Sequence, residues 1–288
     1  DSRMKLIEKI EMFLKNWLRL KKTFPKISYH FSMHKFEQDE LQAFISEGVI
    51  TPFYEIRIQK LKELTFNDVM KRKNPYLFKA KNIQTAEELI KYILDAFLSS
   101  QEETIFGDLM EGLAIFACGK VFNGQKAEQG KFKSIDLIFQ REDKIYIVGI
   151  KSGPNWGNSD QIGRMKTNFK AARKILKSEG NKTKIIAVNG CIYGKDNRPH
   201  KVDKKDMEKS YYKLCGQEFW ELITEDNDFY QKIVVPIDKE AKKRDENFRN
   251  TYSAKINELT KDFSSTYLTG EGNIDWKKLI DFVSKKNS

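Results

Sequence analysis

The sequence predicts an α/β fold in which a sheet core carries further helices at both ends of the chain. Apolar residues at helical spacing dominate the first hundred residues and recur after residue 235. Between these regions, two segments rich in Ile, Val and aromatic residues precede an amphipathic helix and another apolar strand. This order predicts a helical N-terminal region over 4–100, a core over 101–235 and a helical C-terminal extension over 236–288.

Three helices are expected before the sheet. Apolar residues recur at helical spacing from Met4 to Leu20, and a capping box at Thr85–Glu88 opens a helix that continues through Phe97. The segment from Ile105 to Val121 is apolar nearly all round, which predicts a deeply buried helix. The pattern over Thr51–Phe78 is mixed and supports no assignment.

A β-hairpin is expected at the centre of the chain. The apolar segments Phe132–Phe139 and Lys144–Lys151 are joined by the short polar link Gln140–Asp143. A loop containing Gly and Pro then leads into a helix from Ser159 to Gly180, and Thr183–Val188 forms a further strand.

The C-terminal region continues with helices. After Val235–Pro236 a heavily charged helical pattern continues to Phe263, and its part from Lys239 to Phe263 is a candidate dimer arm, with a solvated single helix as the alternative. A Gly-rich turn and a short helix over Asp275–Val283 follow it.

The charge is concentrated in one part of the chain. Lys and Arg number 52 against 41 Asp and Glu, a net charge of +11, and residues 151–215 hold 16 basic against 6 acidic residues. A localised basic region suits a polyanion, because neutralising phosphates releases condensed counterions. Nucleic acid is therefore the leading expected partner and a membrane surface the weaker one, with a solvated Lys-rich surface as the alternative.

Several classes of protein are disfavoured by what the sequence lacks. It has no apolar run long enough for a membrane span, no secretory signal pattern and three widely separated cysteines, so we expect a cytoplasmic protein. It has no GxxxxGK[ST], GxGxxG or GxSxG motif, which argues against a nucleotide cofactor and against a serine hydrolase. His30 and His34 are four residues apart, but no Glu follows His30 as in a metalloprotease.

A carboxylate and a lysine stand out in the hairpin. Asp136 interrupts an apolar strand, where an ionised group is costly unless it is paired or bound to a metal. Lys151 ends the next strand, and pairing across the hairpin can bring the two together. One carboxylate for a divalent ion and one lysine for a water are the minimal parts of metal-assisted phosphodiester hydrolysis. A buried Asp–Lys ion pair without catalysis is the alternative.

Glu111 adds a third group. It is the only charged residue between Asp108 and Lys120 in an otherwise apolar helix. If this helix packs near Asp136, Glu111 supplies a second metal ligand. A structural carboxylate stabilised by the helix dipole is the other interpretation.

These residues carry a resemblance to the PD-(D/E)xK nuclease superfamily. The stretch from Ser134 to Gly153, with Asp136 followed fifteen residues later by Lys151, resembles the type II restriction endonucleases that cut RGGNCCY. Similar segments occur in the same order at Phe106–Glu111, Gly216–Trp220 and Trp276–Leu279, so the resemblance covers about residues 104–288.

The resemblance implies a mixed central sheet of the restriction-endonuclease-like type and a Mg²⁺-dependent, site-specific endodeoxyribonuclease. Asp136, Glu111 and the carbonyl of Ile150 would hold the ion, and Lys151 would orient the attacking water. Because both strands of a symmetric site are cut, the resemblance also implies a two-fold homodimer on double-stranded DNA. A catalytically silent DNA-binding protein and a structure-selective nuclease are the alternatives.

One position departs from the motif. The acid expected two residues before Lys151 is Gly149. The second metal ligand can have migrated, with Glu111 the best substitute and Asp160 a weaker one. Alternatively, activity is impaired, or an engineered replacement of Glu by Gly at this position removed it. We favour migration.

DNA contacts are expected in the loop after Lys151 and on the helix that follows. Loop residues with amide, hydroxyl or aromatic groups can bind bases or phosphates, although a Trp packed under the loop is an equal alternative for Trp156. The candidates are Ser152, Asn155, Trp156, Asn158, Gln161, Arg164, Lys166 and Lys170. Asn189, Arg198 and His200, expected in a polar loop after the last strand, are further candidates for reading bases.

Overall fold

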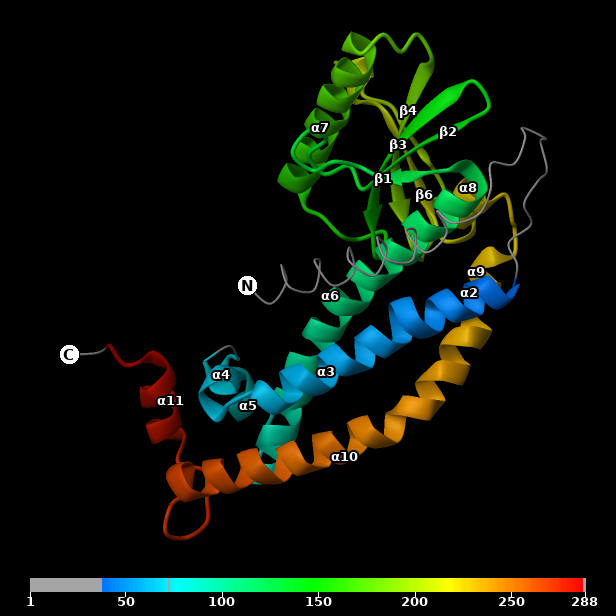
Figure 1. The fold of residues 1–288 in the computed structure, drawn as a ribbon. Helices are drawn as coiled ribbons and strands as arrows, with labels where there is room; N and C mark the ends of the chain where they lie inside the picture. The colour runs from blue at the N-terminus through cyan, green and yellow to red at the C-terminus, as the bar shows by residue number, and fades with distance from the viewer. Residues whose placement is uncertain (1–37, 72, 287–288) are drawn as a thin grey trace. The chain divides into compact units, whose positions relative to one another are not determined.

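The computed structural model describes residues 38–71 and 73–286, which form two compact units. The described residues up to Ile50 belong with Phe106–Lys239 in one unit, and Thr51–Ile105 belongs with the residues from Glu240 onward in the other. The long helices α6 (Ala86–Phe122) and α10 (Val234–Tyr267) each contribute to both units (Figure 1). The helix expected at Met4–Leu20 and the pair His30/His34 lie outside the described residues.

The first unit is built on a mixed six-stranded sheet of order β1-β2-β3-β4-β6-β5. β2 and β3 form the expected antiparallel hairpin, β3, β4 and β6 run parallel, and the short edge strands β1 and β5 pair antiparallel with their neighbours. The bounds are Gln125–Lys126, Leu137–Arg141, Lys144–Lys151, Lys184–Cys191, His200–Lys201 and Tyr211–Cys215 for β1 to β6. A mixed sheet flanked by helices confirms the predicted α/β class.

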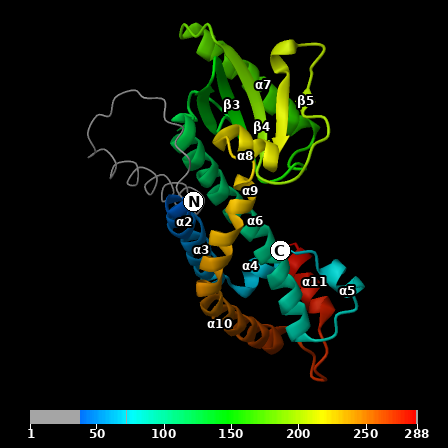
Figure 2. The ribbon, with the colours of Figure 1, turned by 90° about the vertical axis from the view of Figure 1, so that its right-hand side faces the viewer.

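Two helices cover opposite faces of this sheet (Figure 2). α7 (Ser159–Ser178) buries Met165 and Phe169 against Ile147 and its neighbours, each apolar side chain contributing about 1.5–3 kcal/mol. On the other face, α8 (Gln217–Thr224) brings Phe219 so close to Gly190 that a Cβ there would lie 2.3 Å from the ring. The glycine is what allows α8 to approach the strand.

The second unit is helical, and two cations hold its helices together. Arg57 on α3 (Thr51–Glu63) stacks 3.6 Å from the centre of the Phe248 ring on α10 and bonds Glu102 at 2.7 Å. Lys255 on α10 is buried and donates to carbonyl oxygens at the end of α3, where the helix leaves carbonyls without intrahelical partners.

The remaining helices are short. The short helices are α2 (Gln38–Phe44), a π-helix (Ile45–Ile50), α4 (Phe66–Met70), α5 (Pro75–Ala80), a 3₁₀ turn (Met207–Lys209), α9 (Phe229–Lys232) and α11 (Trp276–Ser284). The segment Thr51–Phe78, for which the sequence supported no assignment, forms α3, α4 and most of α5. The expected C-terminal helix is present as α11. No helix in the described part of the chain is long and apolar enough to cross a membrane.

Three expectations about the elements were wrong. The two helices expected at Thr85–Phe97 and Ile105–Val121 are one helix, α6, because the polar residues between them do not break helical geometry. Residues 132–134 form a bend and a turn, in which Ser134 has φ 58°, and β2 begins only at Leu137. Thr183–Val188 is not the last strand, because β5 and β6 follow it and are too short to show a pattern in the sequence.

Candidate active site

Asp136 immediately precedes β2 and is fixed by three hydrogen bonds. Its N–H donates to the Val148 carbonyl at 2.8 Å, and its carbonyl accepts from Ala127 at 3.1 Å. Its carboxylate Oδ2 accepts from the backbone N–H of Ile150 at 2.7 Å. The backbone of β3 therefore holds one carboxylate oxygen, while the side chain remains 14% exposed.

Lys151 ends β3 beside this carboxylate. Its Nζ lies 3.7 Å from Asp136 Oδ2 and donates to the Ile150 carbonyl at 2.6 Å. The same ammonium lies 5.5 Å from the centre of the Trp156 ring, within cation–π range. The hairpin thus brings together the carboxylate, the lysine and the carbonyl that the sequence suggested.

Glu111 reaches the same place from α6. Burial and the negative charge of Asp136 raise its pKa from 4.5 to about 7, against the opposing charges of Lys126 and Lys151. A carboxyl group that neighbours a second carboxylate in a poorly solvated place resists ionisation. The negative charge of Asp136 therefore disfavours ionisation of Glu111, and a divalent cation bound between the two would favour the ionised form of both.

The oxygen donors fit a magnesium ion. Mg²⁺ takes oxygen ligands and is commonly held by one or two carboxylates while it keeps several waters. Asp136, Glu111 and the Ile150 carbonyl are such donors. No three His, Cys, Asp or Glu side chains gather as a metal cluster in the described chain, so a ligand set here would consist of two carboxylates and a carbonyl. Asp160, the weaker substitute, is exposed in the first turn of α7.

The place of the missing acid is occupied by backbone. A Cβ on Gly149 would lie 3.1 Å from the Ser134 carbonyl oxygen and 3.8 Å from the Phe169 ring. Ser134 has φ 58°, a left-handed conformation that is uncommon for residues other than glycine. The turn before Asp136 therefore packs against a glycine, and a longer side chain would displace it.

Two residues of this site were missed from the sequence. The charge of Asp108, three residues before Glu111 on α6, also raises the pKa of Glu111, and Lys126 on β1 lowers it. The spacing of three between Asp108 and Glu111, which places both on one side of a helix, could have indicated the first. Nothing local marks Lys126, whose strand is two residues long.

The loop after Lys151 is tightly held. A Cβ on Gly153 would lie 2.5 Å from the Tyr193 ring, so a larger residue there would require the exposed Tyr193 side chain to move. Asn158 caps α7 by accepting from the Gln161 N–H, and Gln161 Oε1 accepts from the Asn158 N–H, each at 3.0 Å. These two predicted DNA contacts therefore already use their side-chain oxygens locally, while Ser152 and Asn155 are exposed.

Trp156 packs beneath this loop, as in the alternative considered for it. Its ring lies against the apolar cluster between the sheet and α7. Its Nε1–H donates to Asn189 Oδ1 at 3.0 Å. Asn189 was expected in a loop that reads bases, and this was wrong: it lies within β4, is 1% exposed and donates to the Gly149 carbonyl at 3.3 Å.

Much of the basic charge on α7 is paired. Lys166 bonds Asp203 at 3.0 Å and Lys170 bonds Asp206 at 2.8 Å, both on the segment between β5 and β6. Contact of either lysine with a phosphate would require its pair to open. Arg164, on the same helix, is exposed.

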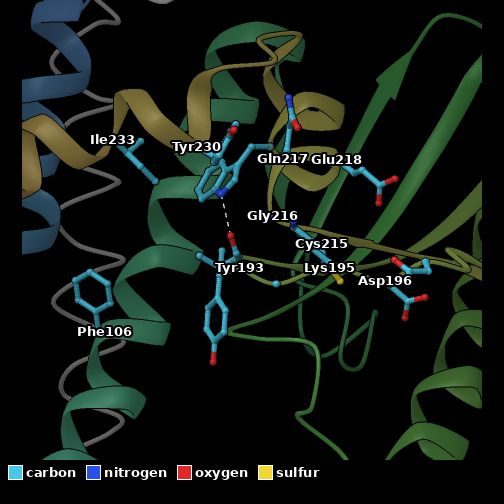
Figure 3. Close-up of a pocket in the computed structure, with 14 residues that line it drawn as sticks. Phe106, Tyr193, Lys195, Asp196, Cys215, Gly216, Gln217, Glu218, Tyr230 and Ile233 are labelled. Atoms are coloured by element: carbon cyan, nitrogen blue, oxygen red, sulfur yellow. Dashed lines mark hydrogen bonds between the residues drawn. The ribbon is translucent and has the colours of Figure 1, made fainter.

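A cavity of about 740 Å³ lies at the carboxyl ends of β4 and β6 (Figure 3). Tyr193, Lys195 and Gln217 are among its lining residues, and Trp220 donates from its indole N–H to the Ile192 carbonyl at 3.0 Å. His200, the last expected base-reading residue, instead begins β5 and stacks on the Tyr212 ring at 4.6 Å.

The mixed sheet, with acids and a lysine at the end of its hairpin, is that of a restriction-endonuclease-like protein. A family model described as Type II restriction endonuclease EcoO109I matches residues 39–245, more than half of the chain. The chain therefore belongs to this family of type II restriction endonucleases. Comparison with curated proteins gives no match.

Proposed function

We propose that the protein is a site-specific endodeoxyribonuclease that hydrolyses phosphodiester bonds of double-stranded DNA with Mg²⁺. The observation that carries this proposal is the meeting of three groups from separate elements. The Lys151 ammonium lies 3.7 Å from the Asp136 carboxylate, and the charge of Asp136 raises the pKa of Glu111 on α6. Membership of the restriction endonuclease family supports the same chemistry.

Asp136, Glu111 and the Ile150 carbonyl would hold the ion. When bound, Mg²⁺ lowers the pKa of a coordinated water and stabilises negative charge on the phosphate. The hydrogen bond from the Ile150 N–H fixes the Asp136 carboxylate before any ligand arrives, so little reorganisation is required.

Lys151 has two tasks in this proposal. Its ammonium would donate a hydrogen bond to the attacking water and hold it in line with the phosphorus. It would also stabilise the charge that develops on the phosphate oxygens. Its present bond to the Ile150 carbonyl, at 2.6 Å, keeps it at the site in the absence of DNA.

DNA would be held by the loop after Lys151 and by the start of α7. Ser152, Asn155 and Arg164 are exposed and can contact phosphates or bases. Lys166 and Lys170 would contribute once DNA displaces their acidic partners. Cutting both strands of a symmetric site requires two active sites, so we propose a homodimer with two-fold symmetry.

Digestion of a plasmid with one RGGNCCY site in the presence of Mg²⁺ tests the proposal, since the resemblance favours this site. We expect linear DNA from the wild-type protein and none from Lys151→Ala. Lys144→Ala is the matched control, because Lys144 begins the same strand at its far end and pairs with Glu142 on the surface.

Other outcomes separate the alternatives. Discrete fragments from other sequences would retain the endonuclease and reject the RGGNCCY site. Cleavage of branched DNA alone would indicate a structure-selective nuclease, and binding without cleavage would indicate a silent DNA-binding protein. Wild-type cleavage by Lys151→Ala would refute the role given to the lysine.

A further inference from the structure

Two residues outside β3, Trp156 and Asn189, connect the Lys151 ammonium to the backbone of its own strand. The Trp156 ring, in the loop after β3, lies 5.5 Å from the ammonium. The indole N–H donates to Asn189 Oδ1 at 3.0 Å, and the Asn189 amide donates to the Gly149 carbonyl at 3.3 Å. The contacts form a closed path, because Gly149 precedes Lys151 by two residues on the same strand.

This path fixes the ring relative to the strand. Asn189 is 1% exposed, so its amide cannot turn to solvent for other partners, and a buried amide is costly to leave without them. β4 pairs with β3 so that Asn189 lies directly opposite Gly149. The Asn189 amide therefore links the backbone of β3, which carries Lys151, to the Trp156 ring, which the Lys151 ammonium contacts.

The position of the ring matters for the lysine. A long, flexible side chain loses rotamer entropy when it is held in one place, and an aromatic face limits where an ammonium can go. The Asp136 carboxylate attracts the ammonium from one side at 3.7 Å. Together the Asp136 carboxylate and the Trp156 ring limit the positions that the Lys151 ammonium can take.

We propose that Trp156 and Asn189 are positioning residues that hold the Lys151 ammonium for DNA cleavage. The inference rests on the proposed nuclease function and adds to it a pair of residues that touch neither metal nor scissile phosphate. It also accounts for a tryptophan and a buried asparagine that the site chemistry itself does not use.

Kinetics of Trp156→Phe, Asn189→Ala and the double variant test the proposal. Trp156→Phe keeps a ring but removes the N–H donor, and we expect kcat to fall about tenfold. Trp156→Leu removes the ring as well and should lower kcat by about 100-fold. DNA affinity, measured in Ca²⁺, should change less than about twofold. Because the two residues act as one unit, the double variant should be no slower than the slower single variant.

Trp220→Phe is the matched control. Trp220 is also in the sheet unit, is 1% exposed and donates its indole N–H to a backbone carbonyl at 3.0 Å. If Trp156 only stabilised the fold, both variants would lower the melting temperature and kcat alike. An equal loss of kcat in Trp156→Phe and Trp220→Phe would overturn the proposal, as would additive effects in the double variant.

A readout without DNA separates this inference from the proposed function. The chain has four tryptophans, so ¹⁵N labelling gives four indole N–H resonances. We expect Lys151→Met to shift the Trp156 resonance and leave that of Trp220 in place. An unmoved Trp156 resonance would overturn the inference even if DNA is cleaved. A shifted one, with a wild-type protein that cuts no DNA, would refute the nuclease function and leave the support of Lys151 standing.

Discussion

Replacing Glu111 by Gln should make the protein more stable at high pH in the absence of metal. The pKa of Glu111 is raised from 4.5 to about 7 by burial and by the charge of Asp136. One pKa unit corresponds to 1.36 kcal/mol, so ionising Glu111 in the folded protein costs about 3 kcal/mol more than in the unfolded chain. Gln keeps the shape of the side chain and removes this cost.

The direction of the pH dependence follows from proton binding. Because the folded pKa lies above the unfolded value, the folded state binds more protons between pH 4.5 and 7, and stability falls as pH rises through this window. Below pH 4.5 the carboxyl group is neutral in both states and the cost is absent. Above pH 7 the full cost applies.

Urea unfolding at pH 5 and pH 8 measures the effect. We expect the free energy of unfolding of Glu111→Gln to exceed that of the wild type by up to about 3 kcal/mol at pH 8 and by much less at pH 5. Addition of Mg²⁺ at pH 8 should stabilise the wild type more than the variant. An equal difference at both pH values would refute the reasoning, since it would mean that Glu111 ionises normally.

Three further predictions concern positions outside the proposed catalytic groups. Gly149→Glu restores the acid of the motif but should lower the free energy of unfolding by about 1–3 kcal/mol in urea, with no gain in cleavage, because backbone fills the space. Lys255→Met should cost about 1–3 kcal/mol in the same measurement, since carbonyls at the end of α3 lose their donor, whereas exposed Lys261→Met should not. Asp206→Asn removes the shorter of two ion pairs of Lys170, the other being with Glu208 at 3.8 Å, and should therefore strengthen DNA binding and steepen its salt dependence. Unchanged binding would argue against a phosphate contact by that lysine.

The sequence by itself predicted the hairpin that carries Asp136 and Lys151, and the pairing of β2 with β3 in the structure agrees with it. A charge in an apolar segment, a lysine at the end of the next and a short polar link between them suffice to predict Asp136 beside Lys151, although Asp136 itself lies just before β2. Hairpin geometry is local, and its pairing follows from residues a few positions apart. The same local rules predicted α7, the charged helix of α10 and the last helix.

Other features depended on distant parts of the chain. β5 and β6 are short strands whose pairing depends on the neighbours that the fold provides. The lysines of α7 looked like phosphate contacts because their sequence neighbours are basic, but their acidic partners lie more than 30 residues further on.

The role of Asn189 was decided only by tertiary structure. In the sequence it precedes a glycine and looks like the start of a polar loop. In the structure it is buried opposite Gly149 and bonded to Trp156. Sequence pattern reports which residues share a face of one element, whereas burial and partners depend on which elements meet. The candidate site lies at the ends of β2 and β3, where the alternation of apolar residues ends. Only the packing of other elements, such as α6 and β4, determines which side chains meet Asp136 and Lys151 there.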